Sequence, residues 1–248
     1  MNTQKRLDSL KSQFREVFYS TAQHYNRYEV FSDFIFCIAA AYRNSIKFTE
    51  STEFEYLQII KKYSRSDVEK LTELFGLLIL ISDVCPPKDH LGELYMEFNL
   101  FNYHRGQHFT PSQVSLMMAR MLMPDLKQKI ALNNFVSISD PACGAGSTLL
   151  ACIAHALNCN INPQKQFFIE GRDIDRLAAL MCYVQLCIWH IPSRIIVGDT
   201  LKNEVIESWY TPSYYLGAWQ WRLNDEPKKI PVQEPNQINF VLVGDTYT

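Results

Sequence analysis

The second half of the chain alternates short apolar runs, rich in β-branched and aromatic residues, with segments of helical character. This alternation constrains the fold more than any other feature. Strands that alternate with helices indicate a parallel sheet whose crossover helices pack on its faces. We therefore predict an α/β domain over residues 101–248, with strands near residues 135–139, 167–169, 195–197 and 238–243 and helices from residue 147 and over residues 175–189.

The first hundred residues carry a different pattern, in which apolar side chains recur at steps of three and four. Leu7, Leu10 and Phe14 begin such a series, and no glycine occurs before Gly76. This spacing is typical of amphipathic helices, and Ser/Thr-x-x-Glu sequences are typical of their starts. We predict a helical N-terminal domain over residues 1–100, a structural bundle without chemistry of its own. The predicted capping boxes are Thr52-x-x-Glu55 and Ser66-x-x-Glu69.

Composition argues against several classes of protein. The formal net charge is −2, so no basic field over the whole chain favours nucleic acid, and DNA contact would have to be local or supplied by a partner. The 7 cysteines contain no Cys-x-x-Cys pair, which indicates reduced thiols and no metal site. The longest apolar run, residues 34–42, is too short to cross a bilayer, and the N-terminus lacks the apolar core of a signal peptide. We expect a cytoplasmic protein that does not enter the membrane.

Three of the predicted strands are followed by an acidic residue within a few positions. Ligands of parallel sheets bind at the carboxyl ends of the strands, where helix N-termini present free N–H groups. Asp140 opens a glycine-containing turn, residues 140–146, and could accept from the ammonium of an amino-acid ligand, directly or through water. Asp173 could accept both hydroxyls of a ribose, with Ile174 against an adenine face. Asp199 could accept from an adenine amino group.

Each of these elements also has an ordinary structural explanation. A loop with two glycines is often a tight turn, Asp173 alone is more typical of a helix cap, and Gly198-Asp199-Thr200 is a common loop tripeptide. Their order distinguishes them, because a glycine loop and two acidic ends follow on successive strands of one sheet. That order favours a nucleotide-like ligand bound at the edge of the sheet.

A further helix is predicted to begin at Thr110-Pro111. The hydroxyl of Thr110 could cap this helix, and Pro111 would occupy its first position. Met117, Met118 and Met121 recur along it at helical spacing. Such a stripe more often fills a core than binds a cofactor, so we expect these methionines to be buried.

The turn Asp140-Pro141-Ala142-Cys143-Gly144-Ala145-Gly146 resembles motif I of the amino-type DNA methyltransferases, and in particular of the modification subunits of type I restriction systems. Upstream, residues 90–95 and 106–111 are similar to segments that those subunits carry before motif I. Residues 171–175 match motif II, and residues 198–201 match motif III. The resemblance covers about residues 88–201, in the family's order.

The resemblance implies a Rossmann-like sheet that binds S-adenosylmethionine (AdoMet), the methyl donor for N6 methylation of adenine in DNA. In the family, a Phe-Thr-Pro turn like the one at residues 109–111 closes over the methionine end of AdoMet. DNA is then the expected partner, bound directly or through another subunit. The candidate cofactor-binding residues are Phe109, Thr110, Pro111, Asp140, Pro141, Cys143, Gly144, Gly146, Asp173, Ile174, Asp199 and Thr200.

The C-terminal segment departs from the family. Catalysis there uses Asn/Asp-Pro-Pro and an aromatic residue: the first side chain accepts from the adenine amino group, and the ring stacks on the flipped base. Here the predicted fourth strand runs into residues 244–248, with Gly244 in the Asn/Asp position and neither proline. Asp245 and Tyr247 are weak candidates for catalytic residues, and an unrelated strand end is at least as good an explanation.

Family members continue with three further strands, so the predicted sheet is truncated after its fourth strand and exposes an edge. We expect the chain to be a fragment, or to pair through this C-terminal edge with another copy or a partner chain. Two functional hypotheses follow: an adenine-N6 DNA methyltransferase-like protein, and a non-catalytic AdoMet-binding regulatory or partner subunit of a DNA modification system. A structural relic without cofactor is the third.

Overall fold

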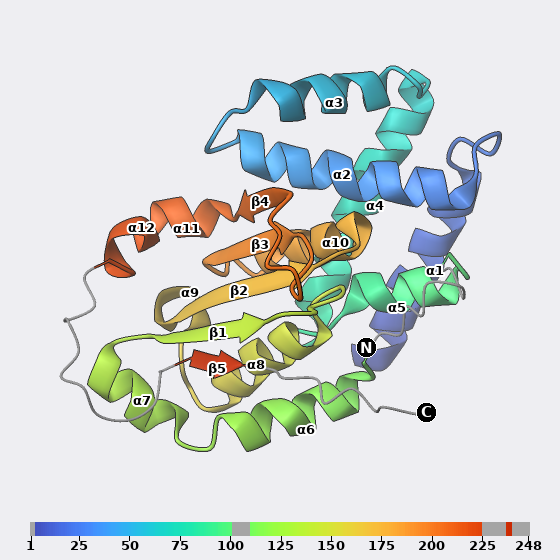
Figure 1. Ribbon diagram of the computed structural model, residues 1–248. Coiled ribbons are helices and arrows are strands. Elements are labelled where there is room, and N and C mark those ends of the chain that lie inside the picture. The colour runs from blue at the N-terminus through green and yellow to red at the C-terminus, as the bar shows by residue number, and fades with distance from the viewer. Residues whose placement is uncertain (1–2, 101–109, 225–236, 240–248) are drawn as a thin grey trace, which may run out of the picture.

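The computed structural model describes residues 3–100, 110–224 and 237–239, and it shows helices followed by a mixed α/β region (Figure 1). The first part contains α1 (Thr3–Ser20), α2 (Arg27–Asn44), α3 (Glu50–Ile60), α4 (Arg65–Val84) and α5 (His90–Glu97). The second part contains α6 (Ser112–Leu122), α7 (Leu126–Asn133), β1 (Val136–Asp140), α8 (Ser147–Asn158), α9 (Pro163–Gln166), β2 (Phe167–Asp173), α10 (Arg176–Ile188), β3 (Ser193–Val197), β4 (Glu207–Tyr210), α11 (Pro212–Leu216), α12 (Trp219–Arg222) and β5 (Gln237–Asn239). The predicted fold class, helices followed by an α/β sheet, is confirmed.

The described strands form one sheet in the order β4-β3-β2-β1-β5. β1 pairs in parallel with β2 on one side and with β5 on the other, and β3 continues in parallel from β2. The chain therefore changes its direction of travel across the sheet at β1. Open α/β sheets bind ligands at such a switch point, beyond the carboxyl ends of the strands. The topology alone therefore predicts a ligand site at the loop that follows Asp140.

One strand, β4, was not predicted from the sequence. β4 pairs antiparallel with β3 at the edge of the sheet, so the predicted fourth strand corresponds to β5, the fifth in chain order. β4 spans only Glu207–Tyr210 and buries Trp209, so it carries no apolar run long enough to indicate a strand. Residues 240–248, with the catalytic candidates Asp245 and Tyr247, lie outside the described residues.

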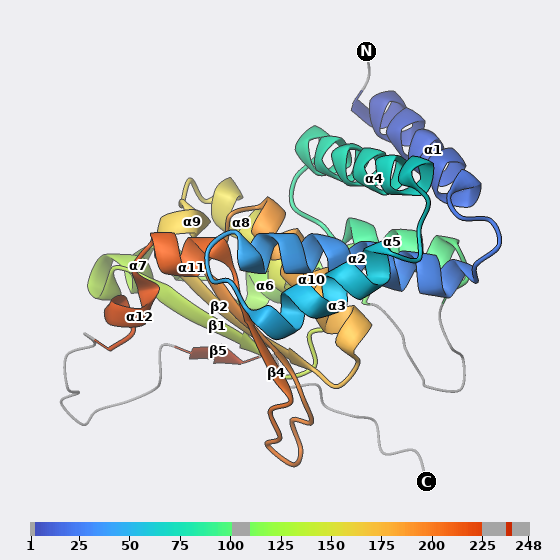
Figure 2. The same cartoon turned by 90° about the horizontal axis from the view of Figure 1, so that it is seen from above.

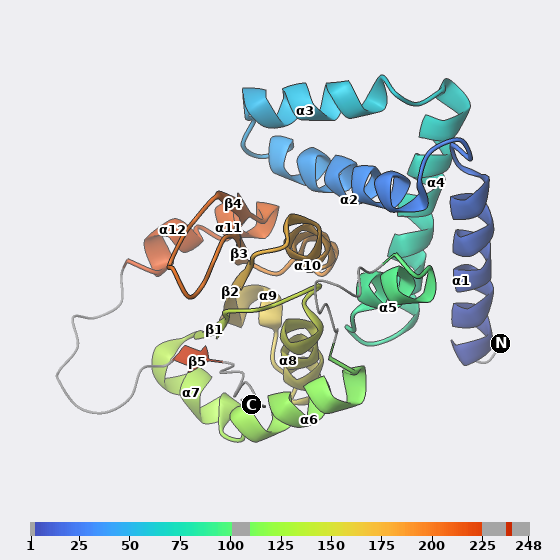
Figure 3. The ribbon, with the colours of Figure 1, turned by 45° about the vertical axis from the view of Figure 1, so that its right-hand side comes forward.

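Helices cover both faces of this sheet. α8 and α10 lie on one side, and α11 and α12 lie on the other (Figure 3). Alternating residues of β2 divide between the two sides: Phe167 and Ile169 join the main core, whereas Phe168 stacks with Trp219 of α12 at a ring-centroid distance of 6.0 Å. The first face is buried, whereas the second is only partly covered and carries the partly exposed ion pair of Arg194 and Glu170.

The N-terminal helices share a core with the sheet region. α1 and α4 pack against each other, and α2 lies along α10 (Figure 2). An ion-pair group reinforces this contact, because the guanidinium of Arg176 on α10 binds both Glu55 of α3 and Glu207 of β4, with a shortest distance of 2.7 Å to each. No described helix is long and apolar enough to span a membrane.

Several local predictions were wrong. α4 begins at Arg65 and is capped by Ser64, whose hydroxyl accepts from the N–H of Asp67 at 3.2 Å, so the capping box starts two residues earlier than predicted. α3 begins at Glu50 after Thr49, which places Thr52 inside the helix. Both errors have one cause: each segment contains several Ser/Thr residues, and the pattern does not say which one has the extended backbone of a cap.

The start and the exposed face of α6 also differ from the prediction. Pro111 is the N-cap of α6, with φ −56° and ψ 140°, and Thr110 makes no capping hydrogen bond to it. The helix packs on α8 through the small buried residues Ser115 and Ala119. The opposite face carries Met117 and Met121 into solvent, where they are 55% and 71% exposed and fill no core. Met118 is partly buried against the core, so the prediction holds for this methionine alone.

Candidate cofactor site

The loop after β1 is a tight turn pressed against α10. The N–H of Gly146 donates to the carbonyl of Cys143 at 2.8 Å, and Gly144 and Gly146 have φ of 53° and 94°. A Cβ at Gly146 would lie 2.8 Å from Sγ of Cys182 on α10. Gly146 is therefore required twice, by its left-handed backbone and by the close approach of α10.

Asp140 lies inside this turn and is only 4% exposed. Its carboxylate accepts from the N–H of Ala142 at 3.1 Å and from the hydroxyl of Thr148 on α8. Burial raises the pKa of Asp140, opposed by the hydrogen bonds from Thr148 and Ala142. The side chain thus holds the turn to the first residues of α8 from within the protein.

Asp173, at the end of β2, joins two loops. Its Oδ2 accepts from the N–H of Gly144 at 2.8 Å, and its Oδ1 accepts from the N–H of Asp175 at 2.8 Å. Burial raises the pKa of this half-buried carboxyl. The cap of α10 is Asp175, which accepts from the N–H of Ala178 at 2.9 Å, so Asp173 does not cap the helix.

The loop after β3 is tied to the other two. The N–H of Gly198 donates to the carbonyl of Asp173 at 2.9 Å, and the hydroxyl of Thr200 donates to the carbonyl of Pro141 at 2.5 Å. Asp199 accepts from the N–H groups of Lys202 and Leu201, and these bonds lower its pKa. The three strand-end loops thus form one hydrogen-bonded unit.

A cleft of about 570 Å³ opens beside the carboxyl end of β2. Asp173 and Ile174 line one wall, and Tyr28 and Ser32 of α2 line the other. Ile174 is 69% exposed and leaves its apolar side chain open to the cleft. A concave site with an apolar face beside a carboxylate has the chemistry to hold a nucleoside, the base against Ile174 and the ribose hydroxyls on Asp173.

The segment before α6 reaches the same region. The hydroxyl of Ser147, the first residue of α8, donates to the carbonyl of Thr110 at 2.9 Å and lies 2.9 Å from the hydroxyl of Ser115. Thr110 therefore adjoins the end of the glycine loop, and Pro111 beside it is exposed. Phe109 lies outside the described residues.

Of the predicted cofactor-binding residues that the structure describes, only Asp173 and Ile174 line this cleft. Cys143 is 5% exposed and packs below the loop, where a hydrogen bond with Cys182 and burial both raise the pKa of its thiol. A Cβ at Gly171 would lie 3.0 Å from this sulfur, so Cys143 fills space between two strands. Among the described residues, no group of three or more His, Cys, Asp or Glu side chains is placed to hold a metal ion.

The residues that pack behind the glycine loop were not predicted from the sequence. Ser147, Thr148, Cys182 and Gln185 all contact the loop, yet only Ser147 and Thr148 had a signal, since they open the helix after a glycine turn. Cys182 and Gln185 lie in the middle of α10 and reach the loop only because the chain folds back.

The topology and the three linked loops define an α/β protein with its candidate ligand site at the carboxyl ends of parallel strands. The chain belongs to the N-6 DNA methylase family, whose model matches residues 87–216, more than half of the chain. This confirms the resemblance noted in the sequence, supports a methyltransferase-like function, and points to AdoMet as the methyl donor.

Comparison with solved structures and curated proteins adds the following. A Listeria monocytogenes structure assigned to the class I S-adenosylmethionine-dependent methyltransferases is 17% identical, with a TM-score of 0.42, over 83% of this chain and 55% of that one. The chain thus matches about half the length of that neighbour. No curated protein matches its sequence.

Proposed function

We propose that this protein binds AdoMet at the carboxyl ends of β1, β2 and β3, as the cofactor-binding part of an adenine-N6 DNA methyltransferase. One observation carries the proposal: the carboxylate of Asp173 binds the glycine loop at Gly144 and also lines the cleft beside the exposed Ile174. The remaining acceptor capacity of Asp173 suits the two ribose hydroxyls. When bound, AdoMet supplies an activated methyl group.

The chain's own residues would then divide the work of binding. Ile174 covers one face of the adenine ring, and Asp199 offers a carboxylate at the neighbouring strand end. Gly144, which lacks a side chain, lets the methionine part approach the backbone. Thr110 and Pro111, held beside Ser147, cover this end of the site.

A second candidate function is a non-catalytic AdoMet-binding partner subunit. The sequence of residues 244–248 favours it, because glycine stands where the family has Asn or Asp and both prolines are replaced. The adenine amino group is a weak nucleophile until an acceptor and a stacking ring hold it in line with the methyl group. We expect the purified chain to methylate DNA poorly, with Asp245 and Tyr247 retaining at most a vestige of activity.

Association through the C-terminal strand edge is part of the same proposal. Among the described strands, β5 pairs with β1 alone and stands at one end of the sheet order. Figures 1 and 3 place α6 at the same end of the molecule as β5. Met117 and Met121 of α6 are exposed. An open strand edge near apolar side chains favours pairing with another chain.

Calorimetric titration with AdoMet tests the first part of the proposal. We expect saturable binding that S-adenosylhomocysteine competes away, and a folded chain that binds neither ligand would overturn the proposed AdoMet site.

Incubation with labelled AdoMet and varied double-stranded DNA then separates the two functions. Robust adenine methylation by the chain alone identifies the enzyme, and binding without transfer identifies the partner subunit. Sedimentation at micromolar concentration, with and without DNA, tests the association, which a strictly monomeric particle would contradict.

A further inference from the structure

Gln185 connects the N-terminal helices to the glycine loop. It lies within α10, is 3% exposed and uses its whole amide. Its Oε1 accepts from the N–H groups of His90 and Leu91 at 2.8 and 3.2 Å. Its Nε2 donates to Oδ1 of Asp89 at 2.9 Å and to the carbonyl of Ala145 at 2.8 Å. One buried side chain thus binds the first turn of α5 and the middle of the glycine loop.

The surroundings allow only one orientation of this amide. The first N–H groups of α5 need an acceptor, because a helix leaves its first four donors without partners. A reversed amide would turn its NH₂ toward these donors and its oxygen toward Asp89 and the Ala145 carbonyl. The start of α5 therefore aims a donor at Ala145.

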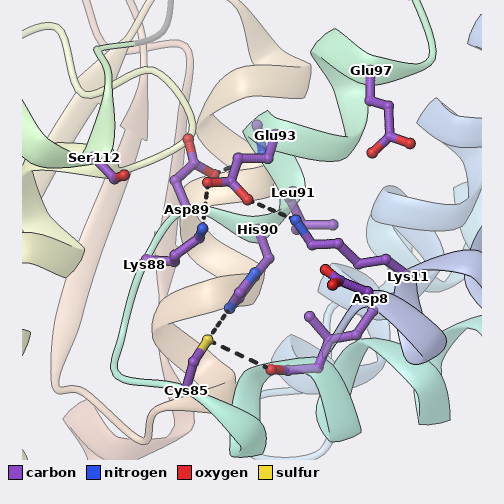
Figure 4. Close-up of polar contacts among 12 residues, drawn as sticks. Asp8, Lys11, Cys85, Lys88, Asp89, His90, Leu91, Glu93, Glu97 and Ser112 are labelled. Atoms are coloured by element: carbon purple, nitrogen blue, oxygen red, sulfur yellow. Dashed lines mark hydrogen bonds and ion pairs between the residues drawn. The ribbon is translucent and has the colours of Figure 1, made fainter. Parts of the chain in front are cut away.

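Asp89 is itself held by the segment that follows it. It is the N-cap of α5 and accepts from the N–H of Gly92 at 2.7 Å. A Cβ at Gly92 would lie 2.1 Å from Oδ2 of Asp89, so only glycine fits there. Figure 4 shows Asp89 and His90 at the start of α5, beside Glu93, which forms ion pairs with Lys11 and Lys88. The cap of α5 therefore explains why residues 89 and 92 are an aspartate and a glycine.

We infer that Gln185 is a positioning residue for AdoMet binding, which orients the glycine loop by holding the carbonyl of Ala145. Ala145 stands between Gly144 and Gly146, the two residues whose backbone can most readily rotate. On one side of Ala145, Gly144 donates its N–H to Asp173, and on the other side, Gly146 is the N-cap of α8. Release of the carbonyl lets this turn leave the geometry that the ligand needs. The inference rests on the proposed AdoMet site.

Two Gln185 variants test this role. Gln185→Met keeps the length of the side chain and removes every hydrogen bond. Gln185→Glu keeps the acceptor toward His90 and Leu91, removes the donor to Asp89 and Ala145, and places a second carboxyl beside Asp89. We expect calorimetry to show AdoMet binding weakened at least tenfold in the first variant and at least fivefold in the second. Hydrogen exchange should rise in the peptide that contains residues 141–147.

Tyr63→Phe is the matched control, because it removes a buried hydrogen bond to Asp33 (2.9 Å) within the N-terminal helices. It should lower the melting temperature and leave AdoMet affinity within twofold of wild type. If either folded Gln185 variant binds AdoMet as the wild type does, or if Tyr63→Phe weakens binding equally, the inference is wrong. Failure of the wild type to bind AdoMet would instead contradict the proposed AdoMet site.

Discussion

The carboxylates that end β1 and β2 occupy equivalent places in the sheet and face different surroundings. Asp140 is 4% exposed, and its partners are Ala142 of the loop and Thr148 of α8. Asp173 is half-buried and lines the cleft. Sequence position predicts both as binding residues, because each is an acid at a strand end. Their surroundings give them different roles, because only Asp173 is accessible from the cleft.

The difference extends to the neighbours of each carboxylate. We call Asp140, Gly146, Asp89 and Gln185 the closed side of the loops, because they face α5, α8 and α10. Asp173 and Ile174 form the open side. Changes of Asp140, Gly146 or Asp89 should act first on the free energy of unfolding, and changes on the open side should act on affinity. Gln185 is the exception on the closed side, because it holds the carbonyl of Ala145 in the glycine loop and its loss should also lower affinity.

The largest effect is expected on the closed side, from Gly146→Ala. The new Cβ meets Sγ of Cys182 at 2.8 Å and forces alanine into a left-handed conformation with φ 94°. Strain and overpacking together should cost on the order of 3 kcal/mol of folding free energy. Chemical denaturation measures the loss. Addition of Cys182→Ala should restore the packing part alone, and a double variant no more stable than Gly146→Ala would show that the contact with α10 is unimportant.

The next effect concerns Asp89. Burial raises its pKa from 3.8 to about 6, so the folded protein holds this proton longer than the unfolded chain. Stability from Asp89 is therefore greatest below pH 4 and falls as the pH rises toward 6, by roughly 3 kcal/mol in total. His90, whose pKa burial lowers to about 4, acts in the opposite direction.

Comparison with Asp89→Asn isolates the contribution of Asp89, because the variant keeps the shape and does not titrate. Urea denaturation from pH 4 to 7 should show the wild type losing stability relative to the variant as the pH rises. A constant difference between the two proteins would mean that Asp89 is not held in a desolvated site.

On the open side, Asp173→Ala should weaken AdoMet binding about tenfold or more. The change removes charge-assisted hydrogen bonds to two hydroxyls, each of which contributes about 1.5 to 3 kcal/mol. Calorimetry of Asp173→Ala and Asp140→Asn compares their AdoMet affinities, and the melting temperature of each variant shows whether it is equally stable. If Asp140→Asn loses more affinity than Asp173→Ala at equal stability, the assignment of the two sides is reversed.

The smallest effect is expected from Ile174→Ala. The side chain is 69% exposed, so its removal should leave the melting temperature within about one degree of wild type. Loss of part of an apolar face against adenine should reduce affinity by roughly threefold to tenfold. Calorimetry measures the affinity, and thermal unfolding measures the stability. A clear loss of stability without loss of affinity would show that Ile174 stabilises the fold and does not contact the ligand.

The closed and open sides also differ in how much of each could be predicted from the sequence. Strands and glycine turns leave local patterns, so the ends of β1, β2 and β3 were predicted from residues near Asp140, Asp173 and Asp199. β4 was missed because four residues around Trp209 form no recognisable run. Gln185 was missed for another reason: its partners lie 40 to 96 residues away, and a single glutamine inside a helix has no local signal.

The most direct test of the account is a crystal structure of the chain with S-adenosylhomocysteine. We predict the ligand at the carboxyl ends of β1 and β2, with both ribose hydroxyls roughly 3 Å from the carboxylate of Asp173 and the adenine ring against Ile174. Asp140 should keep its bonds to Ala142 and Thr148, without direct contact to the ligand. A ligand bound elsewhere, or bound here with its ribose away from Asp173, would contradict the account.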